Sequence, residues 1–114
     1  MEKILTIDGR QVKFKSTGAF LLRYKAQFGR DALQDIFRLQ SAIDNKGQMK
    51  NIDTLDLEVF YNLIWTLAKT ADPSIPPPLE WLDQFSVFPL DEILPELAEL
   101  IFSSFSTTVE PKKK

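Results

Sequence analysis

The chain has 114 residues, enough for one domain, and contains neither cysteine nor histidine. Without cysteine there are no disulfides or thiolate metal sites, and without histidine the commonest metal ligand and proton carrier is missing. The Ser-His-Asp, Cys-His and zinc-site arrangements are therefore excluded, and we expect a protein with no catalytic residues, metal or cofactor.

Charge is distributed unevenly along the chain. Residues 1–50 carry ten Lys and Arg against five Asp and Glu, whereas residues 51–111 carry one Lys against eleven acids. This polarity favours head-to-tail self-association or attraction to a charged partner, although it also fits two halves that are simply well solvated. No run approaches the roughly 20 apolar residues of a membrane span, and the first residues are not a signal peptide. We expect neither membrane insertion nor export.

Residues 1–15 predict a β-hairpin. Val12 and Phe14 alternate with polar residues, as in a half-buried strand. Asp8 and Gly9 between the two apolar runs favour a type I′ turn, since both positions need positive φ. An isolated hairpin is marginally stable in water, so we expect it to pack on the helices that follow.

Residues 17–43 predict a helical hairpin. Ser16 or Thr17 is expected to cap its first helix. Gly29 suits the left-handed position that ends this helix, and Asp31 is expected to begin the second. Apolar residues recur every four positions in the first helix and form one stripe: Phe20, Tyr24 and Phe28.

The second half predicts helices over residues 54–105, after a polar loop at 44–52. A helix restarting at Asp53 or Thr54 and ending at Asp72, before Pro73, is expected to form the spine of the core. Its apolar residues share one broad face: Val59, Phe60, Leu63, Ile64, Leu67, Ala68 and Ala71.

Prolines divide the rest of the chain. Residues 76–78 are read as a rigid turn before a short helix at 79–85, with a polyproline ligand as the alternative. A last helix is expected over 90–105, with Pro95 as a kink or a restart, and residues 106–114 as a flexible basic tail. The fold class expected is mainly α (α+β), a single domain over 1–105 with an N-terminal β-hairpin packed on about four to five helices.

The last helix is the candidate interaction surface, because apolar residues cover more than one side of it. Such a helix is either central to the core or shared with a partner. Its acids Glu92, Glu96 and Glu99 lie along one face and do not converge, so a solvated face is favoured over a metal site. The candidate protein-binding residues are Leu94, Leu97, Leu100, Ile101 and Phe105.

Nucleic-acid binding is not favoured. The two helices around Gly29 resemble a helix-turn-helix and lie in the basic half of the chain. However, Asp31 and Asp35 in the second helix would face phosphates, and Arg38 is its only cation. A plain helical hairpin accounts for the pattern better.

Three segments occur in order in the chain: TGAFLLRYKAQFGRD at 17–31, VFYNLIWTLA at 59–68 and PLEWLDQF at 78–85. With the hairpin before them and the acidic, apolar helix after them, they resemble the tail assembly chaperones of long-tailed phages and prophages of Gram-positive bacteria. The likeness extends over residues 1 to about 105 and consists of packing and capping residues. The residues that match the family pattern are interpreted as structural: Arg23, Tyr24, Phe28, Gly29 and Asp31.

The resemblance implies a mainly helical, non-catalytic protein of the bacterial host cytoplasm that is absent from the finished virion. Its implied partners are the tape measure protein, which it coats, and the tail tube protein, whose subunits it helps recruit. Family members often have a longer form made by programmed ribosomal frameshifting, and the A-rich codons of the lysines at 112–114 fit a slippery site as well as a solubilising tail. The alternatives are a small nucleic-acid-binding regulator and a structural subunit retained in a phage particle.

Overall fold

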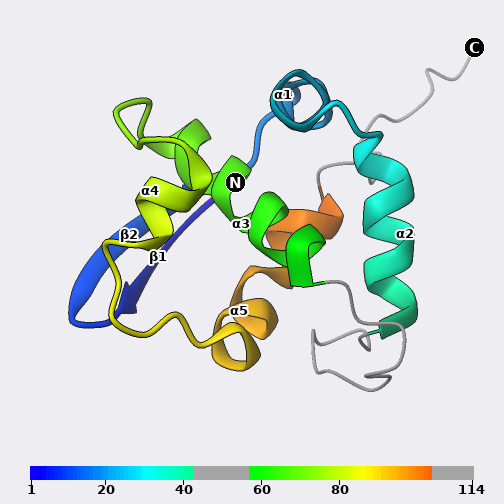
Figure 1. Ribbon diagram of the computed structural model, residues 1–114. Helices are drawn as coiled ribbons and strands as arrows, with labels where there is room; N and C mark the ends of the chain where they lie inside the picture. Colours follow the sequence, from blue (N-terminus) through cyan, green and yellow to red (C-terminus); the bar gives the residue numbers. More distant parts are fainter. Residues whose placement is uncertain (43–56, 104–114) are drawn as a thin grey trace, which may run out of the picture.

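The computed structural model describes residues 1–42 and 57–103 of the chain. Within them a two-stranded antiparallel hairpin is followed by five helices and packs mainly on the third and fifth of them, which confirms the expected α+β fold (Figure 1). The loop expected at 44–52, the helix start expected at Asp53 or Thr54 and the tail at 106–114 lie outside the described residues.

The hairpin joins β1 (Glu2–Ile7) to β2 (Arg10–Lys15). Asp8 and Gly9 have φ values of 52° and 76°, the two positive values that a type I′ turn requires. Alternation along the strands puts one face on the helices, and its buried apolar residues are Ile7, Val12 and Phe14.

The helical hairpin consists of α1 (Phe20–Phe28) and α2 (Ala32–Ala42). The predicted cap was wrong: α1 begins only after Ala19, which makes no side-chain cap, and Thr17 Oγ1 instead accepts the Ala19 N–H at 3.2 Å in the preceding turn. Gly29 ends α1 with φ 68° and donates its N–H to Lys25 O, as expected of a left-handed C-cap.

Helix α3 (Leu57–Ala71) lies at the centre of the fold and contacts β2 and each of the other four described helices (Figure 1). The expected apolar face is buried apart from the half-exposed Ala71, but the burial extends further around the helix and includes Asn62, Trp65 and Thr66. The Thr66 hydroxyl is satisfied within the helix, since Thr66 Oγ1 donates to Asn62 O at 2.8 Å, and Trp65 Nε1 donates to Pro76 O. Surrounded by neighbours on most sides, α3 forms the predicted spine.

The two remaining helices are α4 (Pro78–Leu82) and α5 (Leu90–Ser103). Pro77 is the N-cap of α4 and Pro78 its first residue, where a missing N–H is not needed. Helix α5 continues through Pro95 without a restart. Between them a cluster of aromatic rings with centroids 5.3–5.6 Å apart closes the core, formed by Trp81, Phe85 and Phe88.

A buried carboxylate joins α1 to α2. Asp35 accepts hydrogen bonds from the Tyr24 hydroxyl and from Nε and Nη2 of Arg30, each at 2.7 Å. Burial by itself would raise the pKa of Asp35, but the Arg30 and Tyr24 hydrogen bonds outweigh it and hold that pKa below its ordinary value. Burial and the same Asp35 contact raise the pKa of Tyr24.

Candidate protein-binding groove

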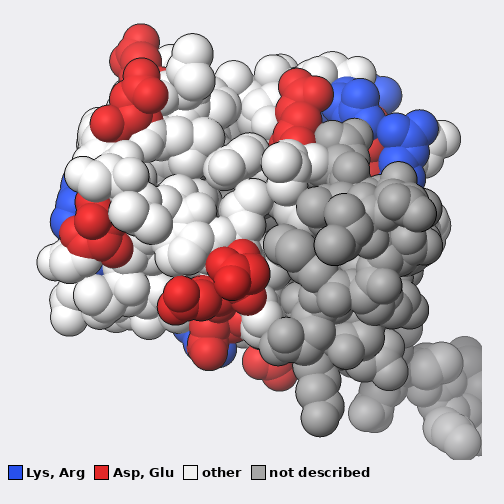
Figure 2. All heavy atoms as spheres, turned by 60° about the horizontal axis from the view of Figure 1, so that its bottom comes forward, with Lys and Arg blue, Asp and Glu red and all other residues white. Residues whose placement is uncertain are grey.

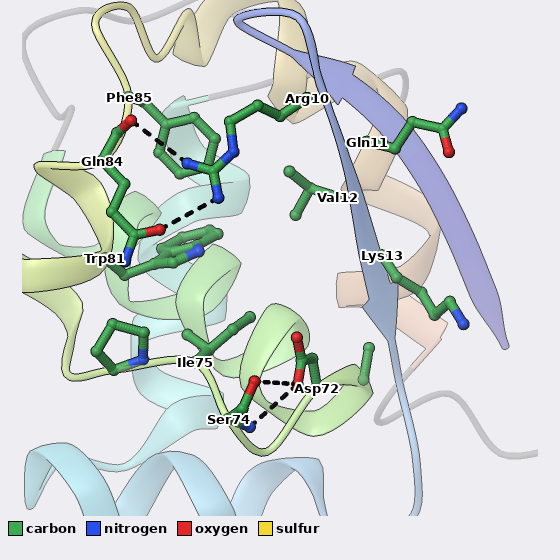
Figure 3. Close-up of a pocket in the computed structure, with 12 residues that line it drawn as sticks. Arg10, Gln11, Val12, Lys13, Asp72, Ser74, Ile75, Trp81, Gln84 and Phe85 are labelled. Atoms are coloured by element: carbon green, nitrogen blue, oxygen red, sulfur yellow. Dashed lines mark hydrogen bonds between the residues drawn. The ribbon is translucent and has the colours of Figure 1, made fainter.

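A groove of about 440 Å³ lies beside β2 (Figure 3). Strand β2 forms one wall, the segment 72–76 after α3 forms another, and α4 with the turn that follows it forms the third. The volume is in the range of about 300–1,000 Å³ that is typical of ligand sites in proteins.

The hairpin tip is fastened to the chain after α4. The Arg10 guanidinium lies 4.9 Å from the centroid of the Phe85 ring and donates to Gln84 Oε1 at 3.2 Å and to Gln84 O at 3.4 Å. Next to it, Asp8 Oδ2 accepts the Ser86 N–H at 2.8 Å. These contacts fix the separation of β2 and α4 at the upper end of the groove in Figure 3.

A tight turn after α3 borders the opposite end of the groove. Asp72 Oδ1 accepts hydrogen bonds from the Ser74 N–H at 3.0 Å and from the Ser74 hydroxyl at 2.7 Å. These two donors lower the pKa of Asp72, so the carboxylate is ionised at neutral pH. The groove therefore has an ionised carboxylate at this end, and the positive charges of Lys69 and Lys13 lower its pKa further.

Side chains from α3 hold the rest of the wall. Lys69 Nζ donates to Pro73 O at 2.7 Å and to Ile75 O at 2.6 Å, and Trp65 Nε1 donates to Pro76 O at 2.9 Å. Three carbonyls of the segment 72–76 are thus bonded to the central helix. The groove is preformed, because each of its walls is fixed by hydrogen bonds or buried packing.

The groove has hydrogen-bonding groups and aromatic surface but no convergent set of acids. Over residues 1–42 and 57–103, no three Asp or Glu side chains are grouped so that they could hold a metal ion. Among the described helices, none has the length and apolar character to cross a membrane. What the arrangement can do chemically is bind a partner through hydrogen bonds and apolar contact.

The structure places the predicted α5 residues in the core. Leu94, Leu97 and Ile101 are completely buried and Leu100 is 2 % exposed, whereas Phe105 lies outside the described residues. A partner can reach the four buried residues only if α5 moves away from α3, so contact through them stays a prediction. On the face shown in Figure 2, acidic side chains stand among neutral ones and Lys and Arg lie toward its margins.

The residues of the family pattern take part in packing and in helix ends. Tyr24 packs on Phe28 with ring centroids 5.0 Å apart, and Phe28 packs on Trp65 at 5.6 Å. Asp31 Oδ1 accepts the N–H of Leu33 at 3.0 Å at the start of α2, and Gly29 ends α1. Arg23 is exposed and borders a smaller groove of about 220 Å³ between α1 and α3.

The groove beside β2 was missed in the sequence. Arg10 and Gln84 are 74 positions apart, and no local pattern joins them. One signal was present, because a sheet of two strands has an unpaired edge on each side.

No protein-family model, curated protein or solved structure matches this chain. The resemblance to phage tail assembly chaperones therefore rests on the three quoted segments and their order.

Proposed function

We propose that this chain is a phage tail assembly chaperone, a non-catalytic protein that binds the tape measure protein and helps recruit tail tube subunits. The observation that best supports a binding role is the rigid groove beside β2, bordered by an open strand edge and aromatic side chains. The three segments that resemble the family supply the identity of the client.

A binding protein of this kind has a clear physical task. By the resemblance, its client is long, helical and apolar in places, and such surfaces associate with one another unless they are covered. A preformed groove covers a client segment without first having to be ordered, which reduces the entropy lost on binding. The chain needs no catalytic group for this task.

The test is co-expression with the tape measure protein encoded in the same genome, followed by size-exclusion chromatography with light scattering. A soluble complex with several copies of this chain per client is the expected result. A tape measure protein that stays insoluble while this chain elutes alone would remove the main support for the proposal.

Two further measurements distinguish the alternatives. Retention on heparin at moderate salt would favour a nucleic-acid-binding regulator. Binding to such a polyanion persists at that salt concentration only when several Lys or Arg side chains contact it together. Detection of this chain by mass spectrometry in purified particles would favour a structural subunit. The chaperone proposal expects neither.

A further inference from the structure

The backbone of β2 has a free side, and the pairing geometry identifies its residues. Ser16 N–H donates to Met1 O at 2.9 Å and the amino terminus donates to Ser16 O at 3.2 Å, so residues 1 and 16 form a hydrogen-bonded pair. Hydrogen-bonded pairs alternate with non-hydrogen-bonded pairs along an antiparallel ladder, so the Leu5–Val12 pair is hydrogen-bonded and the Thr6–Gln11 pair is not. The N–H and C=O groups of Val12 therefore point toward β1, and those of Gln11 point away from it.

By the same alternation, the N–H and C=O groups of Lys13 also point away from β1. Gln11 and Lys13 both border the groove, yet Figure 3 shows their side chains pointing away from the cavity. These two residues therefore contribute main-chain N–H and C=O groups, and not side chains, to the groove. Within the described part of the chain, no hydrogen bond joins these outward groups to another residue.

We propose that the open edge of β2 binds an extended, acidic segment of a partner protein as a third strand of the sheet. This inference rests on the proposed function only in that the partner is the client protein, which would be bound here through an extended segment outside its helices. Neighbouring strands lie about 4.8 Å apart, and the space beyond β2 is the groove itself. The main-chain groups of Gln11 and Lys13 bond the added strand, as in other proteins that bind peptides by strand addition.

Charge selects the kind of segment. Lys13 lies on the outer face of the hairpin and makes no ion pair with any described residue, while Lys15 is 3.9 Å from Glu2. An acidic side chain on the outer face of the added strand would lie opposite Lys13, a favourable cross-strand pair. On the inner face, Arg10 is already bonded to Gln84 and Asp72 disfavours acids near it. Ile75 and Trp81 are buried but leave a small apolar surface toward the groove. The segment expected therefore alternates acidic and apolar residues.

A second copy of this chain fits the edge poorly. Two β2 strands paired edge to edge would bring Lys13 and Lys15 against the same lysines of the other copy. Like charges directly opposite each other destabilise strand pairing, and lysines on an edge strand prevent self-association of this kind.

The direct test uses a fluorescein-labelled hexapeptide of alternating Glu and Val, with a Lys-Val hexapeptide as the charge control. Fluorescence polarisation with the full chain should show about tenfold tighter binding of the Glu-Val peptide. Lys13→Glu should reverse this preference, since it inverts the charge at the cross-strand position. Equal binding of both peptides, or no binding of either, would overturn the inference.

A matched pair of proline variants tests the edge. Gln11→Pro removes an outward N–H from β2 and should weaken Glu-Val binding about tenfold. Thr6→Pro is its control, because Thr6 is the cross-strand partner of Gln11 and faces the other edge of the same hairpin. Hydrogen exchange of the unmodified chain provides a measurement without variants: the peptide should slow exchange at Gln11 and Lys13 but not at Thr6.

The tape measure complex separates this inference from the proposed function. If Gln11→Pro and Thr6→Pro hold the client equally well and the peptide protects no amide of β2, the edge is not the docking site, although the chain remains a chaperone. If the unmodified chain binds the Glu-Val peptide along β2 but fails to hold the tape measure protein, the inference stands and the identity of the client is wrong.

Discussion

Asp35 illustrates how a single residue organises the first half of the fold. It is 2 % exposed and has three hydrogen bonds, two from Arg30 and one from Tyr24. A buried charge is costly unless it is paired and bonded, and here both conditions are met. The network ties the middle of α1, the turn at Arg30 and the first turn of α2 together.

Replacing this carboxylate should make stability less dependent on pH. Asp35→Asn is expected to lower the free energy of unfolding by about 2 kcal/mol at pH 7, because the bonds from Arg30 lose their charged acceptor. The folded pKa of Asp35 lies below the value of 3.8 for an unperturbed Asp, so its stabilising effect is present at neutral pH and is lost as the pH falls through the folded pKa. Urea unfolding from pH 7 to pH 3 should show the two proteins converging in acid.

Asp31→Asn is the control for this experiment. Asp31 is exposed, and asparagine retains a side-chain oxygen to accept the Leu33 N–H, so its stability should stay close to that of the unmodified chain. A difference between Asp35→Asn and the unmodified chain that stays constant down to pH 3 would contradict the account of Asp35.

At the scale of elements, α5 is the segment whose role the structure changes most. Its apolar residues cover so much of the helix that the sequence left both core and partner contact open. The structure packs α5 on α3 and β1, with Leu97 completely buried. Helix α5 is thus needed to complete the core, whatever further contact it makes.

Leu97→Ala should therefore lower the free energy of unfolding by about 3 kcal/mol, since the cavity it leaves cannot collapse fully. Leu97→Asp should fail to fold at 25 °C because it buries an unpaired charge. Glu96→Ala on the same helix is the control and should change stability by less than about 0.5 kcal/mol, as its 3.0 Å ion pair with Lys3 is half exposed. A Leu97→Asp protein that folds but no longer binds its client would instead show that Leu97 contacts the partner.

At the scale of the whole molecule, the buried apolar residues of the described segments form one cluster that reaches from the hairpin to α5. Both tryptophans belong to it: Trp65 packs on Phe28, and Trp81 packs on Phe85. The groove beside β2 lies along this cluster, so its walls should melt together with the core.

This continuity predicts a single unfolding transition. With both tryptophans labelled as 5-fluorotryptophan, which keeps the indole N–H, the fluorine NMR signals of Trp65 and Trp81 should give the same urea midpoint as circular dichroism of the same protein. An earlier midpoint for the Trp81 signal alone would show that α4 and the groove wall open before the core, and would contradict a rigid groove.

The sequence by itself determined the features that depend on near neighbours. The type I′ turn at Asp8 and Gly9, the end of α1 at Gly29 and the apolar face of α3 follow from backbone sterics and periodicity over a few residues. The missing histidines and cysteines excluded whole classes of site in the same direct way.

Only the tertiary structure decided which surfaces are free. Burial of Leu97, the bond from Trp65 to Pro76 and the contact of Arg10 with Gln84 depend on how distant segments dock. The groove exists because the hairpin tip is fastened to the end of α4 while β2 pairs on one side only. Local propensities act over a few residues, whereas docking is selected by the total apolar area that the whole chain can bury, which no single segment specifies.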